Sequence, residues 1–190
     1  MQFLRHVLIA LFVIALPACG PPWAVVRQAV PNPLLGQKHF VVMPIDFSGL
    51  NVGEKSEAGY LAEKDEDSRR SWLGDKASMN EEFARALSNE AAERGIVVMD
   101  PRGKANFVVH PKISWLEPGF YTYFANKPSE VRMTLVISDP NGTVIDEIAM
   151  KHSTPASLSN PASGNRLRDD AEGLGHITGE YLASRVYPED

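Results

Sequence analysis

The sequence predicts an α+β fold, or the related α/β sandwich, with a mixed β-sheet of about five strands and two main helices packed on one face. Three observations predict it. Runs of β-branched residues alternate with segments of helical periodicity, one strong turn motif joins two of these runs, and 44% of the 190 residues are apolar, which suffices for one core. The expected element order is β-α-β-β-β-β-α.

The first strand is expected at residues 39–47, because the sequence HFVVMPIDF is apolar on both faces, as in a buried strand. Pro44 is expected near its end or at a bulge. Residues 48–73 carry six acidic and four basic side chains, and we expect a long solvated loop there.

A helix is expected to start at Ser78, because Ser78 and Glu81 have the spacing of a capping box. An apolar stripe at four-residue spacing follows, formed by Met79, Phe83, Leu87 and Ala91. Gly95 is placed to end this helix, and residues 96–99 predict a short buried strand.

Residues 106–116 alternate apolar and polar side chains, which predicts a strand with one partly solvated face. Pro111 indicates that this strand lies at a sheet edge or contains a bulge. The sequence DPNG at 139–142 is strong turn chemistry, so the flanking runs 131–138 and 143–150 are expected to form a β-hairpin.

The last helix is expected from about Arg166 to Val186, with charged residues around an apolar stripe. Gly175 and Gly179 lie one turn apart, and close packing of the helix backbone against the sheet would explain them.

Polar residues of this helix are expected to make local interactions. Asp169, Asp170 and Glu172 lie near its start, where carboxylates interact favourably with the helix dipole. His176 is expected to pair with Glu172 or Glu180, each four residues away.

The N-terminus has the parts of a secretory signal peptide at residues 1–18, namely Arg5 and an uncharged stretch at 7–16 that is too short to span a bilayer. The sequence LPACG at 16–20 resembles the bacterial lipobox. This resemblance implies cleavage between Ala18 and Cys19 and a lipid on Cys19, with an acyl chain such as palmitate on its amine. It further implies a lipoprotein on the periplasmic face of the outer membrane, because Gly20 replaces the Asp that commonly retains lipoproteins in the inner membrane.

Residues 19–38 contain four prolines, at positions 21, 22, 31 and 33, and this density predicts an extended tether. A first segment docked on the domain is the alternative. Residues 39–190 are expected to form a single α/β periplasmic domain.

Composition and motifs exclude several classes of function. The formal net charge of −5 argues against nucleic-acid binding, and a single cysteine excludes a disulfide scaffold or a multi-cysteine zinc site. There is no nucleophile elbow and no phosphate-binding loop, and the histidines at 39, 110, 152 and 176 lack metal-ligand spacing. We therefore expect no metal, no cofactor and no enzymatic activity.

Five aromatic residues fall within ten positions: Trp115, Phe120, Tyr121, Tyr123 and Phe124. Pro118 and Gly119 interrupt them, which is unusual in a core strand and common at a loop tip. Because aromatic tips often contact a protein partner or a membrane, these five are candidate partner-binding residues. Ordinary sheet packing is the alternative.

Four short segments resemble a group of bacterial envelope lipoproteins: VVMPIDF at 41–47, ERGIVV at 93–98, ANFVV at 105–109 and DPNG at 139–142. The group includes the curli-secretion lipoprotein family, the penicillin-binding-protein activator lipoproteins and the amino-terminal domain of the Tol translocation protein. The resemblance covers residues 40–186 and implies a non-catalytic scaffold or regulator of an envelope machine. It assigns no functional residue other than the lipobox Cys19.

The expected function is that of a lipid-anchored lipoprotein that binds, scaffolds or regulates another cell-envelope protein, and homo-oligomer formation stays open. The alternative is a periplasmic small-ligand binder or enzyme whose site is assembled only in the fold. Its candidate residues are Asp46, His110 and the charged segment 48–73.

Overall fold

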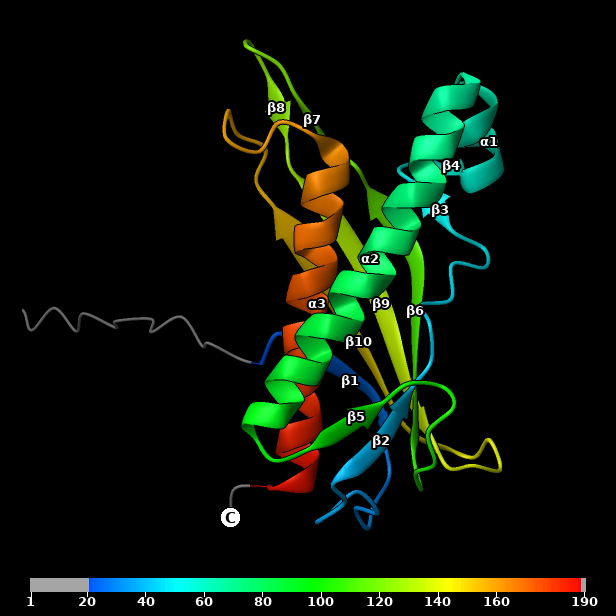
Figure 1. Cartoon of the computed structure of the whole chain (residues 1–190), viewed down its shortest axis with the longest axis vertical. Helices are drawn as coiled ribbons and strands as arrows, with labels where there is room; N and C mark the ends of the chain where they lie inside the picture. Colours follow the sequence, from blue (N-terminus) through cyan, green and yellow to red (C-terminus); the bar gives the residue numbers. More distant parts are fainter. Residues whose placement is uncertain (1–20, 189–190) are drawn as a thin grey trace, which may run out of the picture.

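The computed structural model describes residues 21–188, so the signal peptide and Cys19 lie outside the described residues. The strands are β1 (Trp23–Gln28), β2 (His39–Val42), β3 (Asn51–Val52), β4 (Lys55–Ser56), β5 (Val97–Met99), β6 (Val108–Glu117), β7 (Phe120–Tyr121), β8 (Asn126–Lys127), β9 (Ser129–Ser138) and β10 (Val144–Thr154). The helices are α1 (Glu57–Ala62), α2 (Glu66–Glu93) and α3 (Ser163–Val186) (Figure 1). The predicted α+β class is confirmed.

The main sheet is mixed, and it has eight strands rather than about five. Its order is β1-β10-β9-β6-β2-β5, and β3 pairs with β6 beyond the end of β2 and with β4 on its other side. β2 is parallel to β5 and β6, whereas β6, β9, β10 and β1 pair antiparallel in that order. The additional strands β1, β3 and β4 come from the segments that the sequence assigned to a tether and a loop.

Part of the expected tether is strand β1, which is the docked alternative. β1 pairs with β10, and the Trp23 ring packs edge-to-face on Tyr181 of α3 with the ring centroids 5.5 Å apart. Just after the strand, the Ala29 amide donates to the Asp146 carboxylate at 3.0 Å. The prolines flank β1 and do not interrupt it, so they leave its hydrogen bonds to β10 intact.

The expected loop at 48–73 and the helix start at Ser78 are both wrong. α2 begins at Glu66, and the side chain of its N-cap residue Asp65 accepts a hydrogen bond from the Ser68 amide at 2.7 Å. The buried Trp72 extends the apolar stripe of α2 toward the N-terminus, and its indole N–H donates to Glu57 of α1 at 2.6 Å. The charged residues of this segment thus lie on β4, on α1, at the start of α2 and in the short connections between these elements.

The two turn signals on glycine are confirmed. Gly95 follows α2 with a φ of 71°, and Gly142 adopts a φ of 85° in the turn between β9 and β10. In this turn the Asp139 carboxylate accepts hydrogen bonds from the amides of Asn141 and Thr143 at 2.9 and 2.8 Å.

Pro111 lies in the central strand β6, not at an edge of the sheet, and the predicted alternative of a bulge is confirmed between Ile113 and Trp115 of this strand. The Pro111 carbonyl accepts a hydrogen bond from the Asp46 amide at 2.9 Å, on the side of β6 where Pro44 interrupts the pairing of β2. The missing N–H of Pro111 faces this irregular stretch, so it leaves no regular ladder position unpaired.

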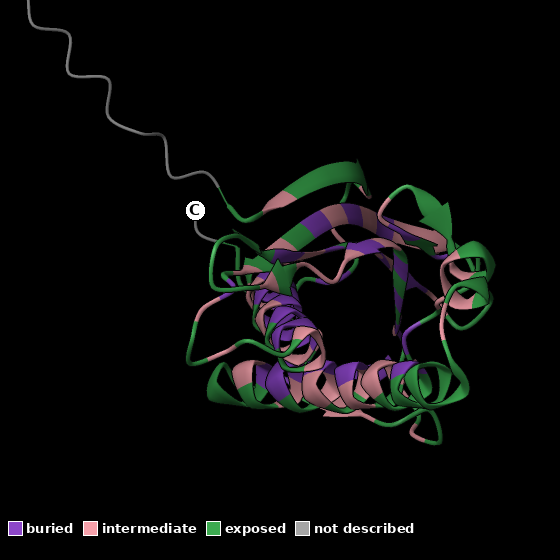
Figure 2. Cartoon of the chain, turned by 90° about the horizontal axis from the view of Figure 1, so that it is seen from above, coloured by how far each residue is buried: buried purple, intermediate pink, exposed green. Residues whose placement is uncertain are grey.

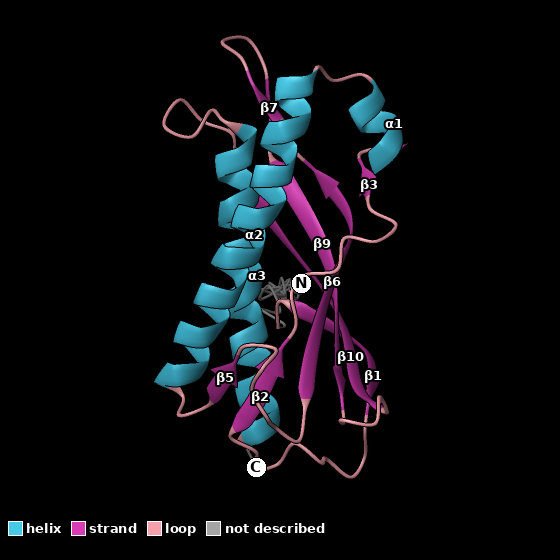
Figure 3. Cartoon of the chain, turned by 45° about the vertical axis from the view of Figure 1, so that its right-hand side comes forward, coloured by secondary structure: helices cyan, strands magenta, loops and turns pink. Residues whose placement is uncertain are grey.

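Helices α2 and α3 lie side by side over one face of the sheet, and Figure 2 shows their buried residues turned toward it (Figures 1, 2 and 3). Their backbones approach closely at two glycines of α3. A Cβ atom at Gly175 would lie 2.6 Å from the Phe83 carbonyl oxygen, and one at Gly179 would lie 2.5 Å from the Glu90 side chain. These glycines therefore permit helix–helix contact, whereas the sequence analysis assigned them to packing against the sheet.

His176 also contacts α2 and not its own helix. Its Nδ1 atom lies 2.8 Å from Glu90 Oε2, so the expected pairing with Glu172 or Glu180 is wrong. Burial alone would raise the pKa of Glu90, but its hydrogen bond with His176 and its ion pair with Arg94 hold the pKa below the usual value.

α3 begins at Ser163 and has no acidic residue in its first turn, so the expected dipole role of Asp169, Asp170 and Glu172 is wrong. Asp170 is instead fully buried. Its Oδ1 atom accepts a hydrogen bond from the Thr154 hydroxyl at 2.6 Å and lies 3.0 Å from His152 Nδ1. The carboxylate thereby joins α3 to the end of β10, a contact between residues distant in sequence.

Replacing Gly175 by Ala tests the close helix contact. The added methyl group meets the Phe83 carbonyl and the Ala86 side chain, so we expect the free energy of unfolding to fall by about 1–3 kcal/mol, as measured by urea denaturation. Gly74→Ala is the matched control, because Gly74 is exposed in α2 with open space around it; this variant is expected to gain about 0.4–1 kcal/mol. Equal stability of the two variants would contradict the packing argument.

Candidate functional site

The two-stranded sheet of β7 and β8 projects from one end of the body (Figures 1 and 3). We call residues 120–127 the aromatic hairpin. Phe120 pairs with Lys127, and the Thr122 amide donates to the Ala125 carbonyl at 2.8 Å to close the tip. The Thr122 hydroxyl donates to the same carbonyl at 2.7 Å. Two aromatic residues, 123 and 124, occupy the closed tip.

The tip presents apolar side chains to solvent. Tyr123 is 91% exposed and Phe124 is 94% exposed, and their rings meet edge-to-face with centroids 5.1 Å apart. Phe120 is about half exposed, and Leu158, in the segment that leads into α3, is 82% exposed at the same end of the body. Contiguous exposed apolar side chains mark interaction surfaces more often than isolated ones do.

The base of the aromatic hairpin needs a glycine. Gly119 has a φ of 64°, and a Cβ atom there would lie 2.3 Å from the Lys127 carbonyl oxygen. Glu117 accepts a hydrogen bond from the Gly119 amide at 3.1 Å and forms an ion pair with Lys127. The turn signal at 118–119 thus marks the place where the chain leaves β6 and enters the hairpin.

The hairpin is held to the body by Arg166, a fully buried residue in the first turn of α3. Its guanidinium donates to the Pro118 carbonyl at 3.0 Å and to the carbonyls of Asn160 and Pro161 at 3.0 and 2.7 Å. One side chain therefore joins the hairpin base, the segment that carries Leu158, and α3. Sequence periodicity does not reveal this role, because it gives Arg166 the pattern of an ordinary charged residue of an amphipathic helix.

The five aromatic candidates do not all belong to this surface. Trp115 lies within β6, where the Arg132 guanidinium stacks over its ring at 4.0 Å and its indole N–H donates to the Gly53 carbonyl at 2.9 Å. Tyr121 is partly buried. The structure therefore exposes Phe120, Tyr123 and Phe124. It places Trp115 within β6, and Tyr121 is partly buried in β7.

The candidates for the alternative function are neighbours that share no direct contact: Asp46 bonds to Ser48 of the charged segment, and its amide donates to the Pro111 carbonyl, next to His110. Asp46 accepts hydrogen bonds from the Ser48 amide and hydroxyl and pairs with Lys112 at 3.3 Å, contacts that lower the pKa of its carboxyl. His110 lies 3.1 Å from the Ser138 hydroxyl, and desolvation lowers the pKa of its ring. Among the described contacts, none joins Asp46 to His110.

Residues 21–188 contain no group of three or more His, Cys, Asp or Glu side chains arranged to hold a metal ion. None of the helices in this range combines the length and the apolar character needed to cross a membrane.

No protein-family model and no curated protein sequence matches the chain. Among solved structures, it is similar to the PelC dodecamer from Paraburkholderia phytofirmans, with 15% identity and a TM-score of 0.43 over 83% of this chain and 97% of that one. It is also similar to a minor lipoprotein from Acinetobacter baumannii (7% identity, TM-score 0.45, 79% and 95% covered) and to the hypothetical protein CT253 from Chlamydia trachomatis (12%, 0.44, 76% and 98%). Likenesses at this level assign neither a family nor a function to the chain.

Replacing Arg166 by Lys tests the support of the hairpin. Lysine keeps the charge but cannot donate in three directions from a planar fork, so we expect faster amide hydrogen exchange in residues 119–127. The free energy of unfolding should fall by about 1–3 kcal/mol. Arg70→Lys is the control, because Arg70 is exposed on α2. A variant that loses stability while hairpin exchange stays unchanged would show that Arg166 supports only the body.

Proposed function

We propose that this protein is a lipid-anchored lipoprotein of the cell envelope that acts as a non-catalytic binding module for another envelope protein. The aromatic hairpin is its contact surface. The single observation that carries the proposal is the pair Tyr123 and Phe124, two large apolar side chains that are more than nine-tenths exposed at a closed, projecting tip.

Aromatic side chains suit such a contact, because they bury a large apolar area and lose few rotatable bonds on binding. The hairpin is closed by Thr122 and Ala125 and fastened at its base through Arg166 and Pro118. A surface ordered before binding loses less conformational entropy when the partner docks, which favours affinity. Phe120, which is about half exposed, adds apolar surface at the base of the hairpin.

The anchor is the proposed lipid on Cys19, which the lipobox-like sequence LPACG supports. Two or more acyl chains bind a bilayer stably, whereas one chain binds reversibly. The chain has a formal net charge of −5, so electrostatic attraction to anionic lipid contributes little to membrane binding. The acyl chains therefore supply the anchoring energy. We place the protein on the periplasmic face of the outer membrane, because Gly20 follows Cys19 in place of the Asp that commonly retains lipoproteins in the inner membrane.

Replacing Cys19 by Ser tests the anchor. Serine has no thiol to form the thioether, so the variant should leave the membrane fraction and appear in the soluble fraction on immunoblots of fractionated cells. Mass spectrometry of the wild-type N-terminal peptide should show the added acyl mass on Cys19. Retention of the serine variant in the membrane fraction would contradict lipid anchoring.

A photo-reactive amino acid in place of Tyr123 tests the contact surface. We expect one envelope protein to be cross-linked from this position in intact cells and identified by mass spectrometry. The same group in place of Asn141, in the exposed turn at the opposite end of β9, is the control. The cross-link at 123 should disappear when Phe120 and Phe124 become Ser. An identical pattern from both positions, or no product at 123, would overturn the proposal.

A further inference from the structure

A second surface, remote from the aromatic hairpin, is a hollow of about 560 Å³ beside the start of β1. It crosses β1, β10, β9 and β6, and its lining includes Thr134, Ala149 and Lys151. These residues alternate along their strands with the buried Met133 and Met150, so they lie on the face of the sheet turned away from the helices. The volume falls in the range of about 300–1,000 Å³ that is usual for small-molecule sites.

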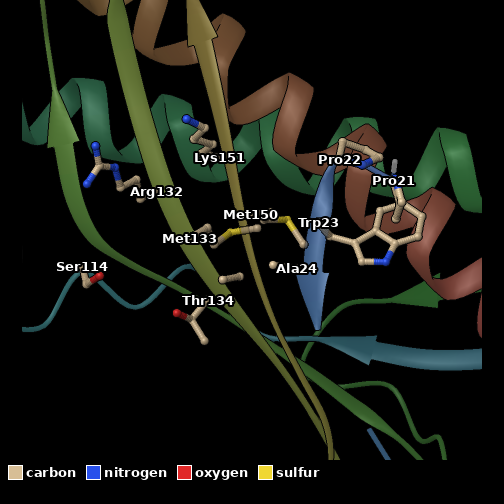
Figure 4. A pocket seen from close by; sticks show the side chains of 11 residues that line it. Pro21, Pro22, Trp23, Ala24, Ser114, Arg132, Met133, Thr134, Met150 and Lys151 are labelled. Carbon is tan, nitrogen blue, oxygen red and sulfur yellow. The ribbon is translucent and has the colours of Figure 1, made fainter. Parts of the chain in front are cut away.

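One end of the hollow is apolar. Pro21, Pro22 and Ala24 line this end together with Ala149, and Met133 and Met150 are buried beneath the middle of the hollow (Figure 4). The Trp23 ring lies on the opposite face of the sheet, against Tyr181 of α3, and this contact holds the start of β1 in place. A ligand with an apolar chain would remove this surface from water when it binds.

The remainder of the lining carries positive charge. Figure 4 shows Arg132 and Ser114 at the end away from the prolines, with Lys151 between the two ends. Lys151 is exposed and, within residues 21–188, has no carboxylate at ion-pair distance. The Arg132 guanidinium is held over the Trp115 ring and donates to Glu130 through Nε, and among the described contacts its terminal nitrogens donate to no protein acceptor.

We propose that this hollow binds an anionic amphiphile with a single apolar chain. The chain would lie on Pro21, Pro22 and Ala24, and the acidic head group would accept hydrogen bonds from Lys151 and Arg132. Charge complementarity decides the class of ligand: a neutral apolar molecule would leave Lys151 unpaired, and a small water-soluble anion would leave the apolar end empty. This site shares no residue with the aromatic hairpin, and its apolar end begins two residues after Cys19.

The test uses residues 21–190, which contain every described element and the whole core, so that neither the signal peptide nor a lipid on Cys19 competes for the hollow. Isothermal titration with lysophosphatidylglycerol, below its micelle concentration, measures binding of an anionic single-chain amphiphile. Lysophosphatidylcholine of the same chain length, whose head group has no net charge, is the comparison. We expect the anionic lipid to bind at least about tenfold more tightly.

Three variants locate the site. Lys151→Gln removes one cation and should weaken lysophosphatidylglycerol binding about tenfold, whereas Lys104→Gln, at an exposed lysine outside the hollow, should leave it unchanged. Ala149→Phe should fill the hollow and abolish binding, with thermal unfolding used to confirm that the variant is folded. No binding of the anionic lipid, equal binding of both lipids, or undiminished binding in Lys151→Gln and a folded Ala149→Phe would each overturn the proposal.

Discussion

The close approach of α2 and α3 is the constraint on which the rest of the structure depends. Gly175 and Gly179 bring the two helix backbones together because neither carries a side chain toward α2. This contact sets where α3 lies over the sheet. The position of α3 in turn determines which residues its first and last turns contact. Arg166 in its first turn reaches the base of the aromatic hairpin, and Arg185 in its last turn reaches Asp146 of β10.

The two ends of α3 therefore support the two surfaces to which we assign function. At the C-terminal end, the buried Asp146 accepts hydrogen bonds from Tyr181 at 2.8 Å, from Arg185 at 2.8 Å, and from the amide of Ala29 just after β1. Burial raises the pKa of the Tyr181 phenol, so the phenol stays protonated and donates to this carboxylate. The edge strand that borders the hollow is thus fastened by a buried, fully bonded charge, which specifies its position more than it adds to stability.

Local sequence signals predicted the parts of the fold that depend on local chemistry. The turn at Asp139–Gly142, the helix end at Gly95 and the exposed aromatic tip each follow from residues that act on their own neighbours. The class of fold and the placement of two helices on one face followed from periodicity.

The remaining features depend on partners distant in the sequence, and local patterns do not reveal them. β1 is a strand only because β10 offers it an edge, and prolines on both sides of β1 suggested a tether. Asp170, His176 and Arg166 read as residues of a solvated helix face, yet each bonds to another element.

The early start of β1 also limits the geometry of the proposed anchor. Only four residue steps separate Cys19 from Trp23, and an extended chain covers at most about 14 Å over that length. A lipid on Cys19 would therefore hold the β1 edge of the sheet close to the bilayer. The domain could rotate at the membrane surface but could not move far from it. A partner of such a protein must itself lie at the membrane or extend to it, because so short a linker would keep the domain near the bilayer and out of the rest of the periplasm.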